Sequence, residues 1–379
     1  MFHQKLVYLT LVSFLSSAGL LHAEELPNAP EWWISKSDQY IWDWIPDLKI
    51  HGVAHEIRGC PICGEKIFES RGHFPFLWHP DRPYKIQCPV CERLFPTNDY
   101  QQWMLDGRKK KLDTTQKYVD DGNGYLAPDG TRFPFIKYAI GEGYKQCIWS
   151  WVLSWQGLPG LGGMYAQTGK EIYAHKAAVI MARIATEYPK LNADRPDDLT
   201  LEQVRQLKYE RPPQMRLATI GGPQVEALYL VNVLKPYMRI KPYLKKGGDA
   251  ELRKFLAVKG INDVKTLIEQ DLCHELILGG LEGNFSGNIL KLKRVMAQAA
   301  QYWDMHDPSR GATTEYILQW VRQEGPHSLE EWLYNHLDRD GFTCTEGLGY
   351  NFKLGLQPLT PLISVLKDTG INLYQEPRI

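Results

Sequence analysis

Apolar side chains recur at helical spacing through the C-terminal two thirds of the chain. In the segment 164–191, MYAQTGKEIYAHKAAVIMARIATEYPKL, they fall three or four residues apart on either side of a Thr-Gly pair. Pro189 closes the second half of this pattern. Such periodicity, interrupted by a glycine turn and closed by proline, predicts a helical hairpin.

The same spacing predicts further helices, whereas alternation typical of strands is scarce after residue 140. The predicted helical stretches are 222–239, 250–278, 288–304, 312–324, 328–338 and 346–366. No strict repeat period connects them, so a regular solenoid is not expected. The segment 157–163, GLPGLGG, lacks the spacing of a dinucleotide-binding loop and is predicted to join two helices as a loop. The fold class is therefore mainly α, with a layer of helical hairpins over 136–379.

The preceding segment, 24–135, has a different composition. Four tryptophans and three prolines in 24–57 predict an extended stretch held in place by aromatic packing. Residues 58–135 are rich in turn formers, among them DDGNGYLAPDG at 120–130, and the Asp-Gly-Asn-Gly at 121–124 predicts a hairpin turn. We expect a small, loop-rich domain to precede the helical one.

The first 23 residues have the pattern of a secretory signal. One lysine precedes an apolar run over 6–21, and Ala23 is followed by two glutamates. This order predicts cleavage after Ala23 and a periplasmic or secreted protein. An uncleaved membrane anchor is the alternative, although the run is short for a span. No other stretch reaches 18 unbroken apolar residues, so no membrane span is expected in the mature chain.

Two Cys-Pro-x-Cys pairs form the most specific motif. Their cysteines are Cys60, Cys63, Cys88 and Cys91. Four thiolates from two close pairs surround one tetrahedral zinc and leave no position for water, which predicts a structural site and not a catalytic one. Gly64 suits the tight turn after the first pair, whereas Glu92 occupies the equivalent position after the second. His73 and His79 are possible alternative ligands that four sulfurs make superfluous.

Disulfide bonds are the competing interpretation of these pairs, because an exported protein meets an oxidising compartment. The remaining cysteines, Cys147, Cys273 and Cys344, are predicted to be buried single thiols.

Charge and aromatic content narrow the range of partners. The 379 residues include 44 Lys+Arg and 44 Asp+Glu, giving a formal net charge of zero. A global basic field for nucleic acid is therefore absent, and no nucleic-acid partner is expected. The chain contains 12 Trp, 20 Tyr and 12 Phe. Such rings fill cores, and they also form the platforms on which sugars stack.

Several motifs together resemble the heparinase II/III-like family of polysaccharide lyases, especially its cysteine-bearing bacterial members. They are CPICG with YKIQCPVCERLFPTNDY, the helical hairpin, EGNFSGNILKL at 282–292 and DRDGFTCTEGLGYNFKLGL at 338–356. The resemblance covers roughly residues 40–366. It implies an incomplete (α/α) toroid of helical hairpins, followed in full-length members by a β-sandwich domain. Since the chain stops at Ile379, we expect that domain to be absent or to be supplied by another protein.

The resemblance also implies β-elimination at a uronic acid. A base removes the proton at C5, and a neutral donor stabilises the carboxylate next to the forming carbanion. By motif, Tyr350 matches the catalytic tyrosine, which removes this proton and returns one to the leaving oxygen. Asn284 or Asn288, with preference for Asn284, matches the carboxylate-binding asparagine. The usual histidine directly after that asparagine is missing here.

The remaining candidate residues have less specific signals. His336 is the nearest histidine to the tyrosine segment and is the preferred additional base, ahead of His274 and His327. Glu346 precedes the tyrosine by four residues and so shares its helical face, and it is expected, with Asn351, to contact substrate.

These observations predict an exported polysaccharide lyase, with an acidic, uronate-containing polysaccharide as its partner. A non-catalytic carbohydrate-binding or scaffold relative is the alternative, because the second wall of the cleft is expected to be missing. A glycoside hydrolase on a similar toroid would need two carboxylic acids across a cleft, and the sequence does not point to such a pair.

Overall fold

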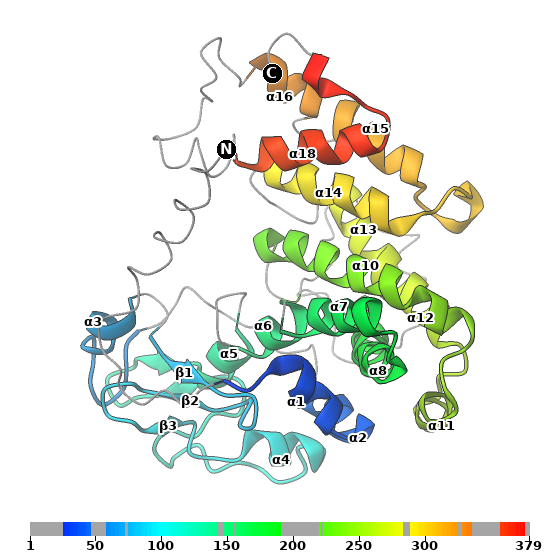
Figure 1. Cartoon of the computed structure of the whole chain (residues 1–379). Helices are drawn as coiled ribbons and strands as arrows, with labels where there is room; N and C mark the ends of the chain where they lie inside the picture. The colour runs from blue at the N-terminus through cyan, green and yellow to red at the C-terminus, as the bar shows by residue number, and fades with distance from the viewer. Residues whose placement is uncertain are drawn as a thin grey trace, which may run out of the picture.

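Helices dominate the computed structural model of the chain (Figure 1). The structure describes residues 26–46, 58–72, 75–141, 147–154, 156–190, 220, 223–282, 289–324, 328–335 and 357–375. Within these ranges every strand lies before Phe135, which confirms the mainly α prediction. Among the helices of the described ranges, none has both the length and the apolar character that a membrane crossing requires.

The N-terminal part combines short helices with two small sheets. Its elements are α1 (Ala29–Ser35), α2 (Asp38–Trp44), α3 (Ile67–Arg71), β1 (Leu77–Trp78), β2 (Ile86–Gln87), β3 (Leu94–Phe95), α4 (Tyr100–Leu105), β4 (Tyr125–Leu126) and β5 (Arg132–Phe133). β2 pairs antiparallel with both β1 and β3. β4 and β5 form an antiparallel hairpin. Its turn lies at 127–131, after the predicted position at 121–124.

The rest of the described chain is helical. Its first elements are α5 (Phe135–Ile140), α6 (Ile148–Leu153), α7 (Leu158–Thr168), α8 (Glu171–Glu187), α10 (Pro223–Lys245), α11 (Ala250–Val258) and α12 (Val264–Ile268). A π-helical turn, η2 (Glu269–His274), follows, and then α13 (Glu275–Leu281), α14 (Ile289–Trp303), α15 (Thr314–Gln323), α16 (Leu329–Asn335) and α18 (Gln357–Asp368). Short 3₁₀ turns are η1 (Tyr188–Lys190), η3 (Pro308–Arg310) and η5 (Leu373–Gln375).

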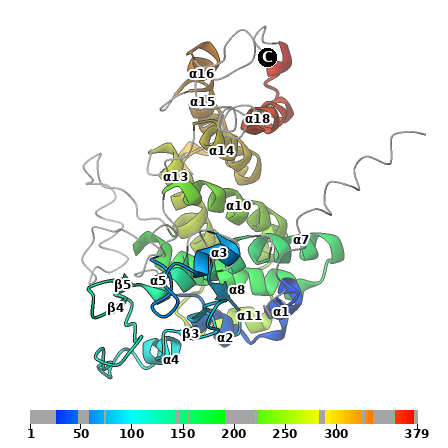
Figure 2. The ribbon, with the colours of Figure 1, turned by 90° about the vertical axis from the view of Figure 1, so that its left-hand side faces the viewer.

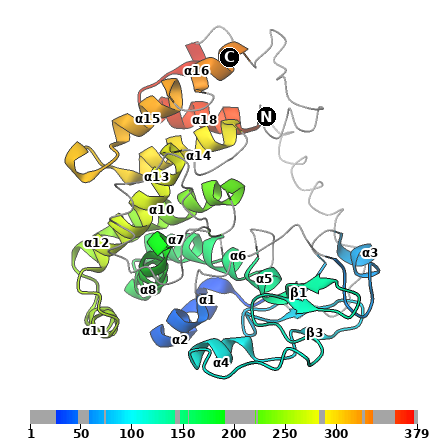
Figure 3. The ribbon, with the colours of Figure 1, turned by 180° about the vertical axis from the view of Figure 1, so that it is seen from behind.

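Successive helices stack into one continuous series (Figures 1 and 3). α8 packs on α7, α7 on α10, α10 on α14, and α14 on α18. α7 and α8 are joined at Gly169, whose φ of +67° ends α7, and they confirm the predicted hairpin. The predicted single helix over 250–278 is instead broken after α11, where Gly260 has a φ of +78°.

Two predictions of secondary structure are wrong. Residues 157–163 do not form a loop, because α7 begins at Leu158. A Cβ at Gly162 would lie 2.7 Å from Pro236 Cβ, so the glycine allows α7 to approach α10 closely.

Residues 29–44 are not extended, since α1 and α2 occupy them. The Ser37 side chain accepts a hydrogen bond from Tyr40 N and caps α2.

A buried charge cluster fastens α2 and the start of α11 to α8. His175 on α8 contacts Asp38 Oδ2 through Nε2 at 2.9 Å and Asp249 Oδ2 through Nδ1 at 2.8 Å. Lys176 Nζ donates to Asp38 at 2.6 Å, and Tyr243 Oη donates to Asp249 at 2.8 Å. Both ring nitrogens of His175 must carry protons to donate to the two carboxylates. The cluster therefore contains an imidazolium with 5% of its surface exposed.

This cluster predicts a pH dependence of folding stability. Burial opposes protonation of His175, but the two aspartates outweigh it and raise its pKa above 6.5. The stabilisation from the histidine is complete below pH 6.5 and is lost as pH rises through the raised value. Burial raises the pKa values of Asp38 and Asp249, but their hydrogen-bonding and charged partners lower them by more, so the net shift is downward. The stabilisation from these carboxylates is therefore lost only as the pH falls below 3.8.

We expect His175→Gln to lower the free energy of unfolding by on the order of 3 kcal/mol at pH 6, because it removes the imidazolium that pairs with both Asp38 and Asp249. The difference from wild type should shrink as the pH rises above 6.5, as measured by urea titrations at several pH values. His306→Gln is the matched control, because His306 is largely exposed. Equal losses at pH 6 and pH 9 would contradict the assigned charge state.

Candidate functional site

The four motif cysteines converge on one point. Their sulfur atoms all lie within 4.8 Å of one another. Cys60 Sγ is 3.8 Å from Cys91 Sγ, and Cys88 Sγ is 4.0 Å from Cys63 Sγ. A tetrahedron of sulfurs around zinc at ~2.3 Å has edges of ~3.8 Å, whereas a disulfide needs ~2.05 Å. The geometry fits a metal ion bound by four thiolates, and all four cysteines are free.

Two similar turns present these sulfurs. In the first, Cys60 and Gly64 exchange backbone hydrogen bonds of 3.1 and 2.8 Å, and Gly64 has a φ of +60°. In the second, Glu92 N donates to Cys88 O at 2.9 Å, and Glu92 has a φ of +58°. Glu92 thus adopts the left-handed conformation that Gly64 supplies in the first turn. The departure noted in the sequence changes the residue type and leaves the turn geometry the same.

Thiol ionisation in the cluster depends on burial and on the neighbouring sulfurs. Burial raises the pKa of Cys60 and, together with the neighbouring thiols Cys91 and Cys88, raises that of Cys63 to about 11. Burial also opposes ionisation of Cys91, but hydrogen bonds from the Arg93 backbone and from neighbouring thiols lower its pKa. A bound dication would favour the thiolate at all four positions, because the ligand form of cysteine is S⁻.

Of the two predicted alternative ligands, His79 is not part of this cluster. His79 Nδ1 accepts a hydrogen bond from Asp81 N at 3.2 Å, and His73 lies outside the described residues. Four sulfurs complete a tetrahedral shell, so the cluster can hold a metal but offers it no open position for substrate. Two other cysteines, Cys147 and Cys273, are buried single thiols as predicted, whereas Cys344 is not among the described residues.

The residues predicted to carry out catalysis and bind substrate lie outside the described part of the chain. They are Asn284, Asn288, His336, Glu346, Tyr350 and Asn351. His327 is also outside it. His274 lies within it, at the end of η2, where its Nε2 accepts a hydrogen bond from Ala312 N at 3.3 Å. Its ring stacks on Trp303, so its contacts favour the structural role over that of a catalytic base.

Buried carboxylates around α10 form contacts that the sequence did not reveal. Glu226 accepts from Tyr188 Oη at 2.8 Å and from Ile220 N at 2.9 Å. Glu269, on η2, accepts from Tyr237 Oη and from Lys265 Nζ. Burial and the neighbouring carboxylate raise the pKa of both tyrosines, so the phenols stay protonated and donate. These satisfied hydrogen bonds fix α8, α10 and η2 relative to one another.

Comparisons of the chain with models of protein families, with curated proteins and with solved structures find no match.

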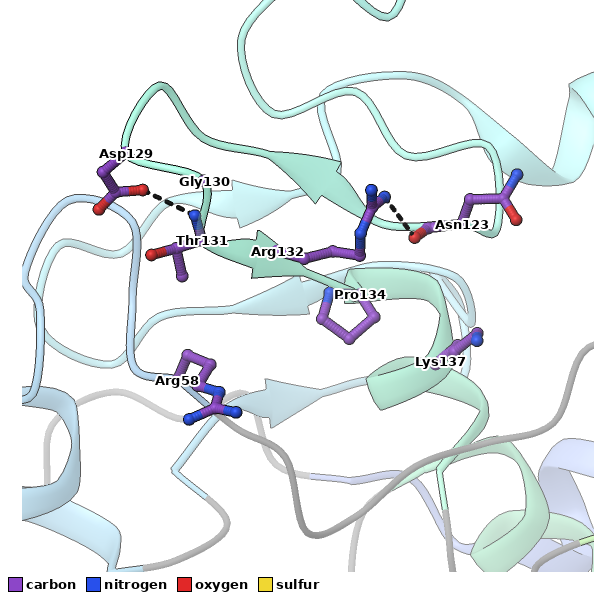
Figure 4. Close-up of a pocket in the computed structure, with 8 residues that line it drawn as sticks. All are labelled: Arg58, Asn123, Asp129, Gly130, Thr131, Arg132, Pro134 and Lys137. Atoms are coloured by element: carbon purple, nitrogen blue, oxygen red, sulfur yellow. Dashed lines mark hydrogen bonds between the residues drawn. The ribbon is translucent and has the colours of Figure 1, made fainter.

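A cavity of about 570 Å³ lies in the N-terminal part of the chain. Three basic side chains line it: Arg58, Arg132 and Lys137 (Figure 4). A second cavity, of about 340 Å³, lies between α2 and α4. One of its cations, Arg183, is already paired with Glu187 at 2.8 Å. Neither cavity was predicted, because the lining residues come from distant parts of the sequence.

Proposed function

We propose that this chain is an exported, lyase-like protein that cleaves uronic-acid-containing glycans by β-elimination, and that its helices belong to an incomplete (α/α) toroid. The proposal rests on the resemblance of its motifs to the heparinase II/III-like family. The observed series of stacked helices supports the proposal of a helical scaffold.

The arrangement of α14 and α18 is the main structural observation in support of the proposal. α14 directly follows the segment with Asn284 and Asn288, and α18 directly follows the segment with Tyr350. The two helices lie side by side, and Gln301 Nε2 donates to Val365 O at 3.4 Å, near their C-terminal ends (Figures 1 and 3). Both helices therefore begin at the same edge of the stack. In the chain, each candidate segment precedes the start of one of these two helices.

The chemistry assigns a separate role to each candidate. Asn284 or Asn288 would donate to the uronate carboxylate and so stabilise the charge that develops when the C5 proton leaves. Tyr350 would take that proton as a phenolate and return it to the leaving glycosidic oxygen. His336 is the candidate second base, and Glu346 and Asn351 would orient the sugar.

The cysteine cluster has a structural role in this proposal. We assign zinc to it, because four thiolates in a tetrahedron are the set that structural zinc prefers. When bound, zinc would cross-link the two cysteine-bearing turns, in a segment that has little regular structure. Because Cys88 directly follows β2, the site would also fasten the end of that strand.

The asparagine assignment can be tested directly. We expect either Asn284→Ala or Asn288→Ala to reduce kcat by about 10²–10³-fold, as loss of a charge-stabilising donor does elsewhere. The other substitution should change kcat little and thus serves as the matched control. The measurement is the near-ultraviolet absorbance of the unsaturated uronate product on alginate, heparan-type and other acidic glycans. Full activity in both variants would contradict this role for the segment.

A further inference from the structure

We propose that the cationic cavity beside the cysteine cluster binds the carboxylate or sulfate group of an acidic sugar, as a site separate from the one that performs elimination. Its lining residues are Arg58, Asn123, Asp129, Gly130, Thr131, Arg132, Pro134 and Lys137 (Figure 4). The volume of about 570 Å³ is within the range of small-molecule sites. The inference deepens the proposed function and rests on it for the class of ligand.

Three separate segments supply the positive charge. Arg58 lies two residues before Cys60, Arg132 is on β5, and Lys137 is on α5. In Figure 4, Pro134 lies between the Arg58 and Lys137 side chains. Across the described ranges of the chain, neither of these two cations forms an ion pair or a side-chain hydrogen bond. Their donors are therefore available to a ligand.

The third cation is held in a fixed orientation. Arg132 Nη1 donates to Asn123 O at 3.0 Å and to Gly124 O at 3.2 Å. These carbonyls belong to the turn that the buried Asp120 carboxylate organises through Gly122 N and Gly124 N. Arg132 keeps further N–H donors beyond these two bonds, because a guanidinium has five.

The balance of charge in the cavity favours an anion. Asp129 is the single carboxylate among the lining residues, and its Oδ1 accepts from Thr131 N at 2.9 Å. It stands at the tip of the β4–β5 turn in Figure 4, away from Arg58 and Lys137. Three cations against one anion in a concave surface concentrate negatively charged ligands.

The donor types indicate which anions fit. A guanidinium presents parallel N–H groups that match the two oxygens of a carboxylate or sulfate, and an ammonium adds a point charge. Uronates and sulfated sugars carry these groups. The side chains of Asn123 and Thr131 are polar and can bond to sugar hydroxyls.

The test compares two charge-matched double variants of the full-length, metal-loaded protein. Arg58→Gln with Lys137→Gln removes the two unpaired cations of the cavity and leaves Arg132, which supports the turn. Lys109→Gln with Lys110→Gln removes two exposed cations from the same part of the chain. Calorimetric titration uses alginate- and heparin-derived tetrasaccharides, a neutral maltotetraose and sodium sulfate. Metal content and Tm of each variant establish that it is folded.

The inference predicts that the cavity variant binds the acidic tetrasaccharides at least about 10-fold more weakly than wild type, and that the control variant binds as wild type does. Equal binding by the cavity variant, or equal weakening in both variants, would overturn it. Sulfate binding as tight as tetrasaccharide binding would reduce the cavity to a simple anion site and also overturn it. Binding of maltotetraose with the same affinity would do so too.

The two proposals can fail separately. Wild-type protein that binds acidic tetrasaccharides through this cavity but forms no unsaturated product would contradict the lyase function and support the cavity. Wild-type protein that forms the product, together with unchanged binding in the cavity variant, would support the lyase function and overturn the cavity.

Discussion

Cys60→Ser is expected to abolish stoichiometric metal binding, which should be about one zinc per chain in the wild type. A serine hydroxyl is a poor replacement for a thiolate, and loss of even an outer-shell partner weakens metal affinity by about 10–100-fold. We therefore expect a loss greater than about 100-fold for a direct ligand. Elemental analysis after dialysis against a weak chelator measures this.

The same substitution should unfold the two cysteine-bearing turns, because binding free energy at a structural site is folding free energy. The buried indole of Trp78 lies on β1, which belongs to the small sheet beside the cluster. Tryptophan emission should therefore shift to longer wavelength. Cys147→Ser is the matched control, since its sulfur accepts from Ser150 N and serine can replace it as a cap. Wild-type protein without metal, and with the four cysteines in disulfides, would contradict the assignment.

Tyr350→Phe is expected to reduce kcat for elimination by about 10²–10⁴-fold, with the fold unchanged. Phenylalanine keeps the ring and removes only the hydroxyl that must carry the proton, and loss of a general acid or base has this magnitude. KM should change much less, because the substitution keeps the aromatic ring and removes a single hydroxyl group. The measurement is a steady-state assay of the unsaturated uronate product.

Tyr334→Phe provides the control for this substitution. Tyr334 is 72% exposed near the end of α16 and precedes the tyrosine segment in sequence. Its loss of a hydroxyl should leave kcat and KM at their wild-type values. Full activity in correctly folded Tyr350→Phe would remove the tyrosine from the mechanism and leave His336 as the candidate base to examine.

The features predictable from the sequence were those encoded over short distances. The α7–α8 hairpin was predicted because apolar spacing and the turn at Gly169 lie within one segment. The cysteine cluster was predicted because ligand type and pair spacing are local properties. The prediction of a loop at 157–163 was wrong because it relied on glycine content. Gly162 is instead required by a close contact with Pro236 on α10, more than seventy positions away. The prediction of an extended stretch relied on the tryptophans of α1 and α2 and overlooked Ser37, which caps α2.

The candidate sites also differ in whether local sequence motifs could predict them. The catalytic assignments at Asn284, Asn288 and Tyr350 rest on local motifs and stay predictions. The cationic cavity could not be predicted, because Arg58 comes close to Arg132 and Lys137 only after the cysteine cluster and the β4–β5 hairpin have formed. The ion pairs of His175 with Asp38 and Asp249 likewise depend on the packing of α2 and α11 against α8.

The most direct test of the proposed reaction is mass spectrometry of the products formed from an acidic glycan in oxygen-18-labelled water. Elimination breaks the C4–O bond and gives an unsaturated uronate at the new non-reducing end, without uptake of solvent oxygen. The account predicts fragments that lack one water relative to hydrolysis products and carry no label. Labelled, saturated fragments would identify a hydrolase and contradict the account, and intact glycan that still binds the protein would assign the chain to the non-catalytic class.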